Sequence, residues 1–167
     1  FCSNEQMWGT LYRMRDPEDV VAEIKAYKQQ YNINGFELHD LTFIVNRKWL
    51  LSFAKRLVEE DLGLRWTIQN TRSEAINAEV VDLLMEAGCV RLMVAPESGS
   101  EYQQLDMNKR VDLEEMAKCV KTISRRGLAL KANFIVGLPN ESHIDILKSI
   151  WFGLKLSYLG VDSVLFY

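Results

Sequence analysis

The sequence contains, at residues 88–100, the run Gly-Cys-Val-Arg-Leu-Met-Val-Ala-Pro-Glu-Ser-Gly-Ser. Residues 90–95 are apolar or β-branched apart from Arg91, which is typical of a buried strand. A helical pattern over residues 78–87 precedes this strand and ends at Gly88, and a polar turn follows it. Helix, glycine, buried strand and polar turn form a unit that recurs along the chain.

The same alternation of helix and strand patterns continues on both sides of residues 88–100. Helical spacing begins at Asp16-Pro17, an N-cap with proline at the first helical position, and we expect further helices from about residue 46 and over 78–87, 113–127 and 144–159. The strands that we expect between them are 36–39, 64–69, 90–95, 130–136 and 161–167. Strands joined by helices predict parallel pairing with right-handed crossovers. Two architectures fit this α/β pattern, a closed or partial (β/α) barrel and an open doubly wound sheet, each as one domain over residues 1–167.

Composition narrows the class of protein. The 167 residues are 48% hydrophobic and carry a net charge of −3 without a basic tract, which argues against general nucleic-acid binding. No apolar run approaches the roughly 18 residues of a membrane span. Three widely spaced cysteines without a signal peptide favour a reducing, cytoplasmic location over a disulfide scaffold. The opening Phe1-Cys2 and the final strand-like run suggest a piece of a longer polypeptide.

Polar residues cluster where the expected strands end. They are His39-Asp40, residues 69–72 (Gln-Asn-Thr-Arg), residues 96–100 and residues 137–141. Chemistry in both candidate architectures gathers at the carboxyl ends of the strands, so this pattern predicts an α/β enzyme that binds a small molecule. Simpler interpretations stay open: His39 and Asp40 can cap a loop, and residues 97–100 can be a polar turn with Ser100 as a helix N-cap.

Other motifs limit the chemistry. Cys89 and Cys119 lie among apolar residues and are expected in the core rather than as ligands. The chain has no phosphate-binding loop, no Gly-x-Gly-x-x-Gly and no serine elbow, which argues against nucleotide kinases, classical dehydrogenases and α/β-hydrolases.

Five segments together resemble the radical SAM superfamily, and they occur along the chain in the same order as in that family. Phe1-Cys2-Ser3 looks like the end of its Cys-x-x-x-Cys-x-aromatic-Cys motif, and residues 13–24 resemble the helix that follows. Residues 37–43, residues 96–110 and residues 133–141 resemble the ends of its second, fourth and fifth strands. The resemblance implies a partial TIM-type barrel whose first strand lies upstream. Within the superfamily, the combination is most similar to the branch with cobalamin-binding domains.

The resemblance also implies roles for individual residues. Cys2 matches a ligand of a 4Fe–4S cluster and Phe1 matches the aromatic residue beside adenine. Glu97 matches the residue at the ribose hydroxyls of S-adenosylmethionine (SAM), and Lys109 the partner of its carboxylate. The remaining matches are Asp40 for the methionyl amino group, in place of the usual Gly-Gly-Glu, Ile135 for the adenine, and Gln69, Asn70 and Arg72 for substrate contact.

The activity implied is reductive cleavage of SAM to a 5′-deoxyadenosyl radical, with thiolates as the cluster ligands. A cobalamin-dependent methylation or related C–C bond formation is the leading expectation, with a small-molecule substrate and an electron donor such as flavodoxin or ferredoxin. Three alternatives stay open: a methylthiotransferase of tRNA or a ribosomal protein, a cluster-free barrel lyase or isomerase, and a non-catalytic scaffold.

Overall fold

The computed structural model describes residues 6, 7, 9, 11–40, 42–71, 76–109 and 111–167, without the side chain of Asn70. Its centre is one parallel sheet in the order β1-β2-β3-β4-β5. The strands are β1 (Gly35–Leu38), β2 (Arg65–Thr71), β3 (Cys89–Glu97), β4 (Ala129–Phe134) and β5 (Ser163–Phe166). The predicted parallel α/β fold is confirmed. Neighbouring strands follow one another in sequence, without the strand-order reversal of a doubly wound sheet, which selects the barrel architecture.

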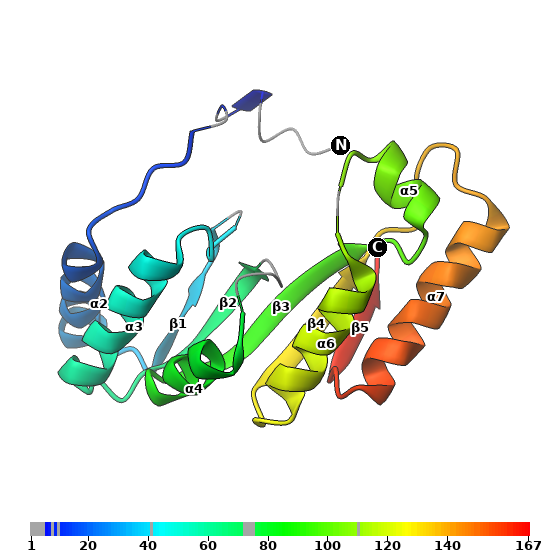
Figure 1. Cartoon of the computed structure of the whole chain (residues 1–167). Helices are drawn as coiled ribbons and strands as arrows, with labels where there is room; N and C mark the ends of the chain where they lie inside the picture. Colours follow the sequence, from blue (N-terminus) through cyan, green and yellow to red (C-terminus); the bar gives the residue numbers. More distant parts are fainter. Residues whose placement is uncertain (1–5, 8, 10, 41, 72–75, 110) are drawn as a thin grey trace.

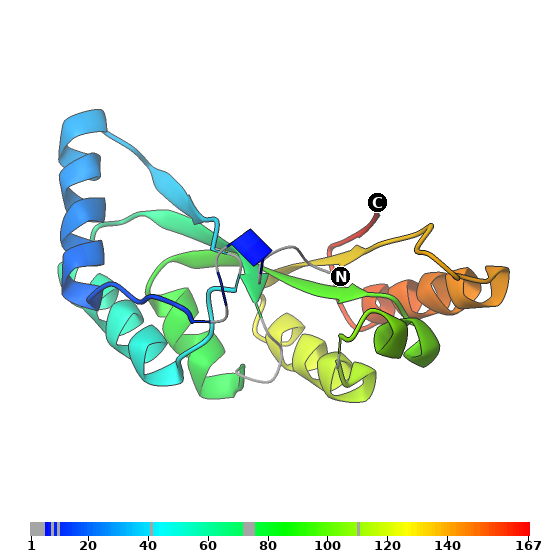
Figure 2. The same cartoon turned by 90° about the horizontal axis from the view of Figure 1, so that it is seen from above.

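Helices cover one face of the sheet. They are α2 (Pro17–Tyr31), α3 (Arg47–Glu60), α4 (Ala78–Glu86), α5 (Glu101–Asp106), α6 (Leu113–Ser124) and α7 (His143–Tyr158). All strands run with their carboxyl ends toward the top of Figure 1. Seen from above in Figure 2, the sheet is curved, and the helices labelled in Figure 1 lie on its convex side. This is the wall of a partial barrel.

Local chemistry explains where the helices begin. Asp16 accepts a hydrogen bond from the backbone N–H of Glu18, and Pro17 occupies the first turn of α2. Asn46 and Asn77 cap α3 and α4 in the same way. These caps satisfy backbone donors that have no partner inside the helix.

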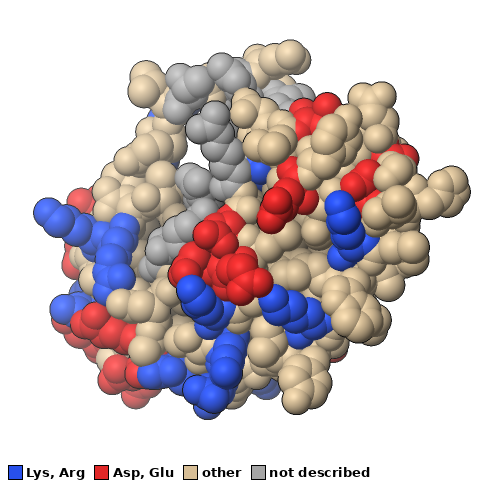
Figure 3. All heavy atoms as spheres, turned by 45° about the vertical axis from the view of Figure 1, so that its right-hand side comes forward, with Lys and Arg blue, Asp and Glu red and all other residues tan. Residues whose placement is uncertain are grey.

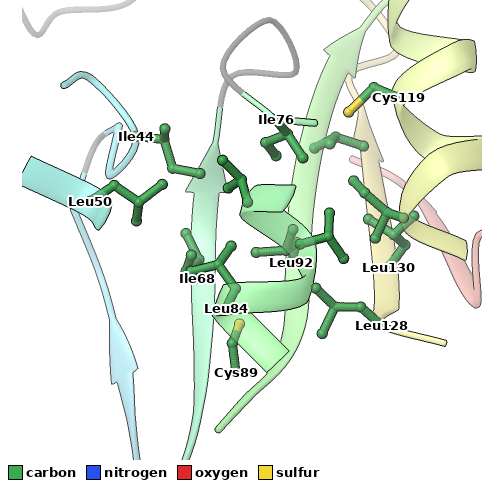
Figure 4. Packing of buried hydrophobic residues seen from close by; sticks show 14 of the residues in the cluster. Ile44, Leu50, Ile68, Ile76, Leu84, Cys89, Leu92, Cys119, Leu128 and Leu130 are labelled. Atoms are coloured by element: carbon green, nitrogen blue, oxygen red, sulfur yellow. The ribbon is translucent and has the colours of Figure 1, made fainter. Parts of the chain in front are cut away.

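The core lies between the sheet and the convex-side helices (Figure 4). In β4 burial alternates, so that Leu130, Ala132 and Phe134 face the helices. Each fully buried leucine or phenylalanine contributes about 1.5–3 kcal/mol. Cys89 and Cys119 belong to the same core, as predicted.

Several predicted boundaries were wrong, among them those of β3, β4 and β5. β3 runs on to Glu97 rather than ending at residue 95, and the pairing of β3 with β4 shifts between Val94 and Glu97. β4 ends at Phe134 rather than at residue 136, although the amides of Ile135 and Val136 still donate to the carbonyls of Glu97 and Tyr167. β5 starts at Ser163, since the amide of Val161 still closes the end of α7. The six-residue helix α5 was expected only in the simpler interpretation, in which a polar turn precedes a helix with Ser100 as its N-cap.

Within the described ranges, no helix combines the length and the hydropathy that a bilayer crossing needs.

Candidate SAM-binding site

The carboxyl ends of β3 and β4 bring three of the predicted residues together. We call residues 96–100, Lys109 and Ile135 the β3–β4 rim. Lys109 Nζ lies 2.7 Å from Glu97 Oε1 and donates to the carbonyl of Ala95, also at 2.7 Å. The Ile135 amide donates to the Glu97 carbonyl at 2.8 Å. The amide of Ile135 is therefore engaged, and only its carbonyl is available to an adenine ring.

Glu97 and Lys109 are partly buried but reachable. Their side chains are 15% and 24% exposed, respectively. Glu97 also has a left-handed backbone, with φ at +64°. This conformation costs a residue with a side chain about 1–2 kcal/mol, and such strain gathers at functional sites. A carboxylate and an ammonium group are thus held side by side at a strand end.

The loop at residues 96–100 is fastened to α7. Ser149 Oγ lies 3.1 Å from Ser98 Oγ and accepts from the amide of Gly99 at 2.9 Å. Ser100 Oγ donates to Asp145 Oδ1 at 2.5 Å, so Ser100 does not cap α5 through its side chain. Hydrogen bonds from the Ser100 and Ser142 hydroxyls lower the pKa of Asp145 to about 2. Asp145 therefore stays ionised and fixes the loop against the start of α7.

The carboxyl ends of β1 and β2 are built differently. We call residues 37–40 and Gln69 the β1–β2 rim. Gln69 Nε2 donates to Glu37 Oε2 at 3.0 Å, and His39 Nε2 lies 3.2 Å from the same oxygen. His39 thus contacts a carboxylate rather than capping the backbone. Asp40 is exposed, like His39 and Glu37. Gln69 reaches this rim, as predicted, but its neighbours are acidic.

A cavity of about 800 Å³ lies beside the β1–β2 rim. Its walls come from α2, β1 and residues 11–15, and its lining includes Tyr27, Phe36, Leu38, Asp40 and Trp49. The lining is mainly apolar, and its charged members are Arg13, Arg15, Glu23, Glu37 and Asp40.

Several predicted residues lie outside the described part of the chain. These are Phe1, Cys2 and Arg72, together with the side chain of Asn70. Among the described residues, no three His, Cys, Asp or Glu side chains come together as a metal site. Burial raises the pKa of the Cys89 thiol to about 12, which disfavours the thiolate that a metal needs.

Sequence reasoning missed Gln104. Its side-chain amide is buried and donates to the carbonyls of Pro96 and Ser98, at 2.6 and 2.7 Å. Gln103 is buried beside it. Two adjacent glutamines at the buried positions of a helix are unusual, and that pattern was the available signal.

Comparison with known proteins places the chain in a family. The sequence model of the Radical SAM superfamily matches residues 1–151. The chain therefore belongs to the radical SAM superfamily, which confirms the resemblance seen in its strand-end motifs.

Individual relatives point to methyltransferases and a cyclase. The chain is 30% identical over 143 residues to the anaerobic magnesium-protoporphyrin IX monomethyl ester cyclase of Rubrivivax gelatinosus, covering 85% of this chain and 26% of the relative. It is 29% identical over 156 residues to an uncharacterized methyltransferase of Pyrococcus horikoshii, covering 93% and 34%. The chain thus spans about a quarter to a third of the length of these curated relatives.

The fold is also found in a solved methyltransferase. Two structures of the radical SAM methyltransferase TsrM from Kitasatospora setae align with a TM-score of 0.80 at 17% identity, over 92% of this chain and 30% or 31% of theirs. One contains tryptophan and a SAM analogue, the other cobalamin and a [4Fe–4S] cluster. At this identity the likeness establishes the fold.

Proposed function

We propose that the chain is the core domain of an enzyme that cleaves SAM reductively, with Cys2 as one of three cysteine ligands of a 4Fe–4S cluster. The other two cysteines lie upstream of Phe1 in this proposal. When bound, the cluster supplies the electron that cleaves SAM to a 5′-deoxyadenosyl radical. The observation that carries the proposal is the Glu97–Lys109 pair, held at a strand end of a chain that belongs to the superfamily.

The β3–β4 rim suits the chemistry of SAM. Glu97 can accept hydrogen bonds from both ribose hydroxyls, and Lys109, already oriented by Glu97 and the Ala95 carbonyl, can pair with the methionyl carboxylate. The carbonyl of Ile135 is left for the adenine, and Phe1 is the aromatic residue assigned beside that ring. Asp40, across the sheet, is the proposed acceptor for the methionyl amino group.

The concave face supports binding of a ligand inside the barrel. In β2 and β4, Thr67 and Asn133 alternate with residues that face the helices, so they lie on the concave side. Thr67 Oγ1 and Asn133 Oδ1 are buried and have no hydrogen-bond partner among the described residues. Buried polar atoms normally find partners. Bound ligand or water would supply them here, and we keep Gln69, Asn70 and Arg72 as the proposed substrate contacts.

The apolar cavity between α2 and the outer edge of β1 suits a further strand. It is lined by Ile24 and Tyr27 of α2 and by Phe36 and Leu38 of β1. A strand upstream of residue 1 would pair with β1 and fill this space, which completes the order expected of the barrel.

For the reaction, we propose methylation that uses cobalamin held by a domain outside these residues. A small-molecule substrate and a flavodoxin or ferredoxin as electron donor belong to the same proposal. The methyltransferase relatives support this class of reaction. A tRNA methylthiotransferase is less favoured, because basic and acidic side chains are interspersed on the face shown in Figure 3 rather than forming a basic field.

The test uses the parent polypeptide, reconstituted anaerobically with iron and sulfide and then mixed with SAM and dithionite. We expect 5′-deoxyadenosine from the wild type and none from Cys2→Ala. Cys119→Ala is the matched control, since Cys119 is buried in the core. Loss of the cluster in Cys119→Ala but not in Cys2→Ala would contradict the assignment, and so would a wild type that binds no cluster.

A further inference from the structure

The unusual backbone of Glu97 must be held by its surroundings. The torsions φ and ψ of Glu97 together relate two peptide planes: one carries the Pro96 carbonyl and the other carries the Glu97 carbonyl. The second plane is fixed, because the Glu97 carbonyl accepts from the amide of Ile135 at 2.8 Å. The first plane needs a separate restraint if the +64° value is to persist.

Gln104 provides that restraint. Its side-chain nitrogen donates to the Pro96 carbonyl at 2.6 Å and to the Ser98 carbonyl at 2.7 Å. A primary amide has exactly two N–H donors, and both are used here. The two acceptors flank Glu97 along the chain, so Gln104 and Ile135 together fix three consecutive peptide planes around it.

Because Gln104 is buried, the loss of its two hydrogen bonds should be costly. Gln104 is 5% exposed, so water does not readily replace its amide if the amide is lost. The carbonyls would then lack a donor, which is more costly than losing the same bond at a surface. The alternative for the loop is to turn the peptide planes toward another donor, and this moves Glu97.

We propose that Gln104 is a positioning residue that holds Glu97 in its left-handed conformation, and thereby sets the carboxylate for the ribose of SAM. The second half of this statement rests on the proposed function, whereas the first concerns the chain alone. Gln104 acts through Glu97 and touches no ligand itself.

The neighbouring residue, Gln103, offers a matched control. Gln103 is on the same helix and fully buried, but neither its side-chain nitrogen nor its oxygen has a partner among the described residues. Gln103→Met and Gln104→Met make the same change of shape and polarity at neighbouring buried positions. Only the second removes donors from the loop at residues 96–100.

The first measurement is amide hydrogen exchange over residues 97–100 in the parent polypeptide without SAM, since Pro96 has no amide hydrogen. We expect exchange to speed up about tenfold in Gln104→Met, from two lost hydrogen bonds, and to stay within about twofold of wild type in Gln103→Met. Equal exchange in all three proteins would overturn the positioning role. An equal acceleration in both variants would also overturn it, since that reflects packing.

The second measurement is the affinity for S-adenosylhomocysteine, by equilibrium dialysis. We expect about tenfold weaker binding in Gln104→Met and unchanged binding in Gln103→Met. Wild type that binds no S-adenosylhomocysteine would overturn the proposed function, while the exchange result would still decide the role of Gln104. Accelerated exchange with unchanged affinity would overturn the link to the ribose.

Gln104→Glu is the second variant, if Gln104→Met does not fold. A carboxylic acid donates one hydrogen bond and a carboxylate donates none. The acceleration of exchange relative to wild type should therefore shrink as the pH falls and the carboxyl group is protonated. A pH-independent difference would contradict the proposal.

Discussion

The β3–β4 rim and the β1–β2 rim lie at the same end of one sheet, yet they differ in how firmly their side chains are held. At the β3–β4 rim, Glu97 and Lys109 are mostly buried and are bound by backbone carbonyls and amides. At the β1–β2 rim, Glu37, His39 and Asp40 are exposed, and the Glu37 carboxylate contacts the side chains of His39 and Gln69. In the proposed function, the β3–β4 rim is therefore preorganised for SAM, whereas Asp40 at the β1–β2 rim would hold the methionyl amino group more loosely.

The largest effect should come from crowding the anchored loop. A Cβ at Gly99 would lie 2.5 Å from the Lys148 carbonyl oxygen and 2.8 Å from Ser149 Cα. We expect Gly99→Ala to cost about 3 kcal/mol in the free energy of unfolding, the upper end for overpacking, and to weaken SAM binding as well. Urea unfolding and equilibrium dialysis measure the two effects.

Gly127→Ala is the control for this change. Gly127 has φ at +80° but nothing within 4 Å of the added Cβ, so it should cost about 1 kcal/mol through backbone strain alone. Its SAM affinity should equal that of the wild type. A Gly99→Ala protein as stable as the wild type would show that the loop is not tightly packed on α7.

The next effect concerns the ion pair at the β3–β4 rim. Lys109→Met removes hydrogen bonds to the Glu97 carboxylate and the Ala95 carbonyl. We expect about 10- to 100-fold weaker SAM binding, because a hydrogen bond to a charged group is worth about 1.5–3 kcal/mol. Lys118→Met, at an exposed position on α6, is the control and should bind normally. Equal affinity in both variants would remove Lys109 from the site.

The anchoring of the loop should also depend on pH. The pKa of Asp145 is lowered from 3.8 to about 2 by the Ser100 and Ser142 hydroxyls, so its ionised form stabilises the fold. This contribution is complete above about pH 4 and is lost as the pH falls toward 2. Wild type should therefore unfold at a higher temperature than Asp145→Asn above pH 4, with the gap closing below it. A constant gap from pH 2 to 6 would contradict this role.

Asp40 should give a smaller change. Because Asp40 is exposed, water competes for its contact with the methionyl amino group. We expect Asp40→Asn to bind SAM only about threefold more weakly, within the range of exposed charge pairs. An effect as large as that of Lys109→Met would show that the β1–β2 rim closes over the ligand.

The two core cysteines should matter least. Cys89 and Cys119 are buried under the helices, and the Cys89 thiol has its pKa raised to about 12. Residues 1–167 alone should therefore fail to assemble a 4Fe–4S cluster on reconstitution, and native Cys89 should resist iodoacetamide at pH 8. Near-stoichiometric iron and sulfide in the isolated 167 residues would overturn this expectation.

The order of the strands and the polar residues that follow them were predictable from sequence, because each strand is a short apolar run between a helix and a polar turn, although the ends of β3 and β4 were misplaced. The strand-end pattern predicted Glu97 and the family resemblance predicted Lys109, and their side chains are in contact in the structure. The left-handed backbone of Glu97 and the hydrogen bonds from Gln104 beside it were not predictable, since they depend on a register shift between β3 and β4. Asp145 was missed for a related reason. It reads locally as a helix-capping acid, and only packing of α7 on the loop brings it to Ser100.

The most direct test of a preorganised SAM anchor compares Glu97→Gln with Asp40→Asn in the reconstituted parent polypeptide, by SAM equilibrium dialysis under one set of conditions. The account predicts that Glu97→Gln binds SAM at least about tenfold more weakly than Asp40→Asn, because buried charged hydrogen bonds exceed exposed ones. Equal affinities, or a larger loss in Asp40→Asn, would contradict it.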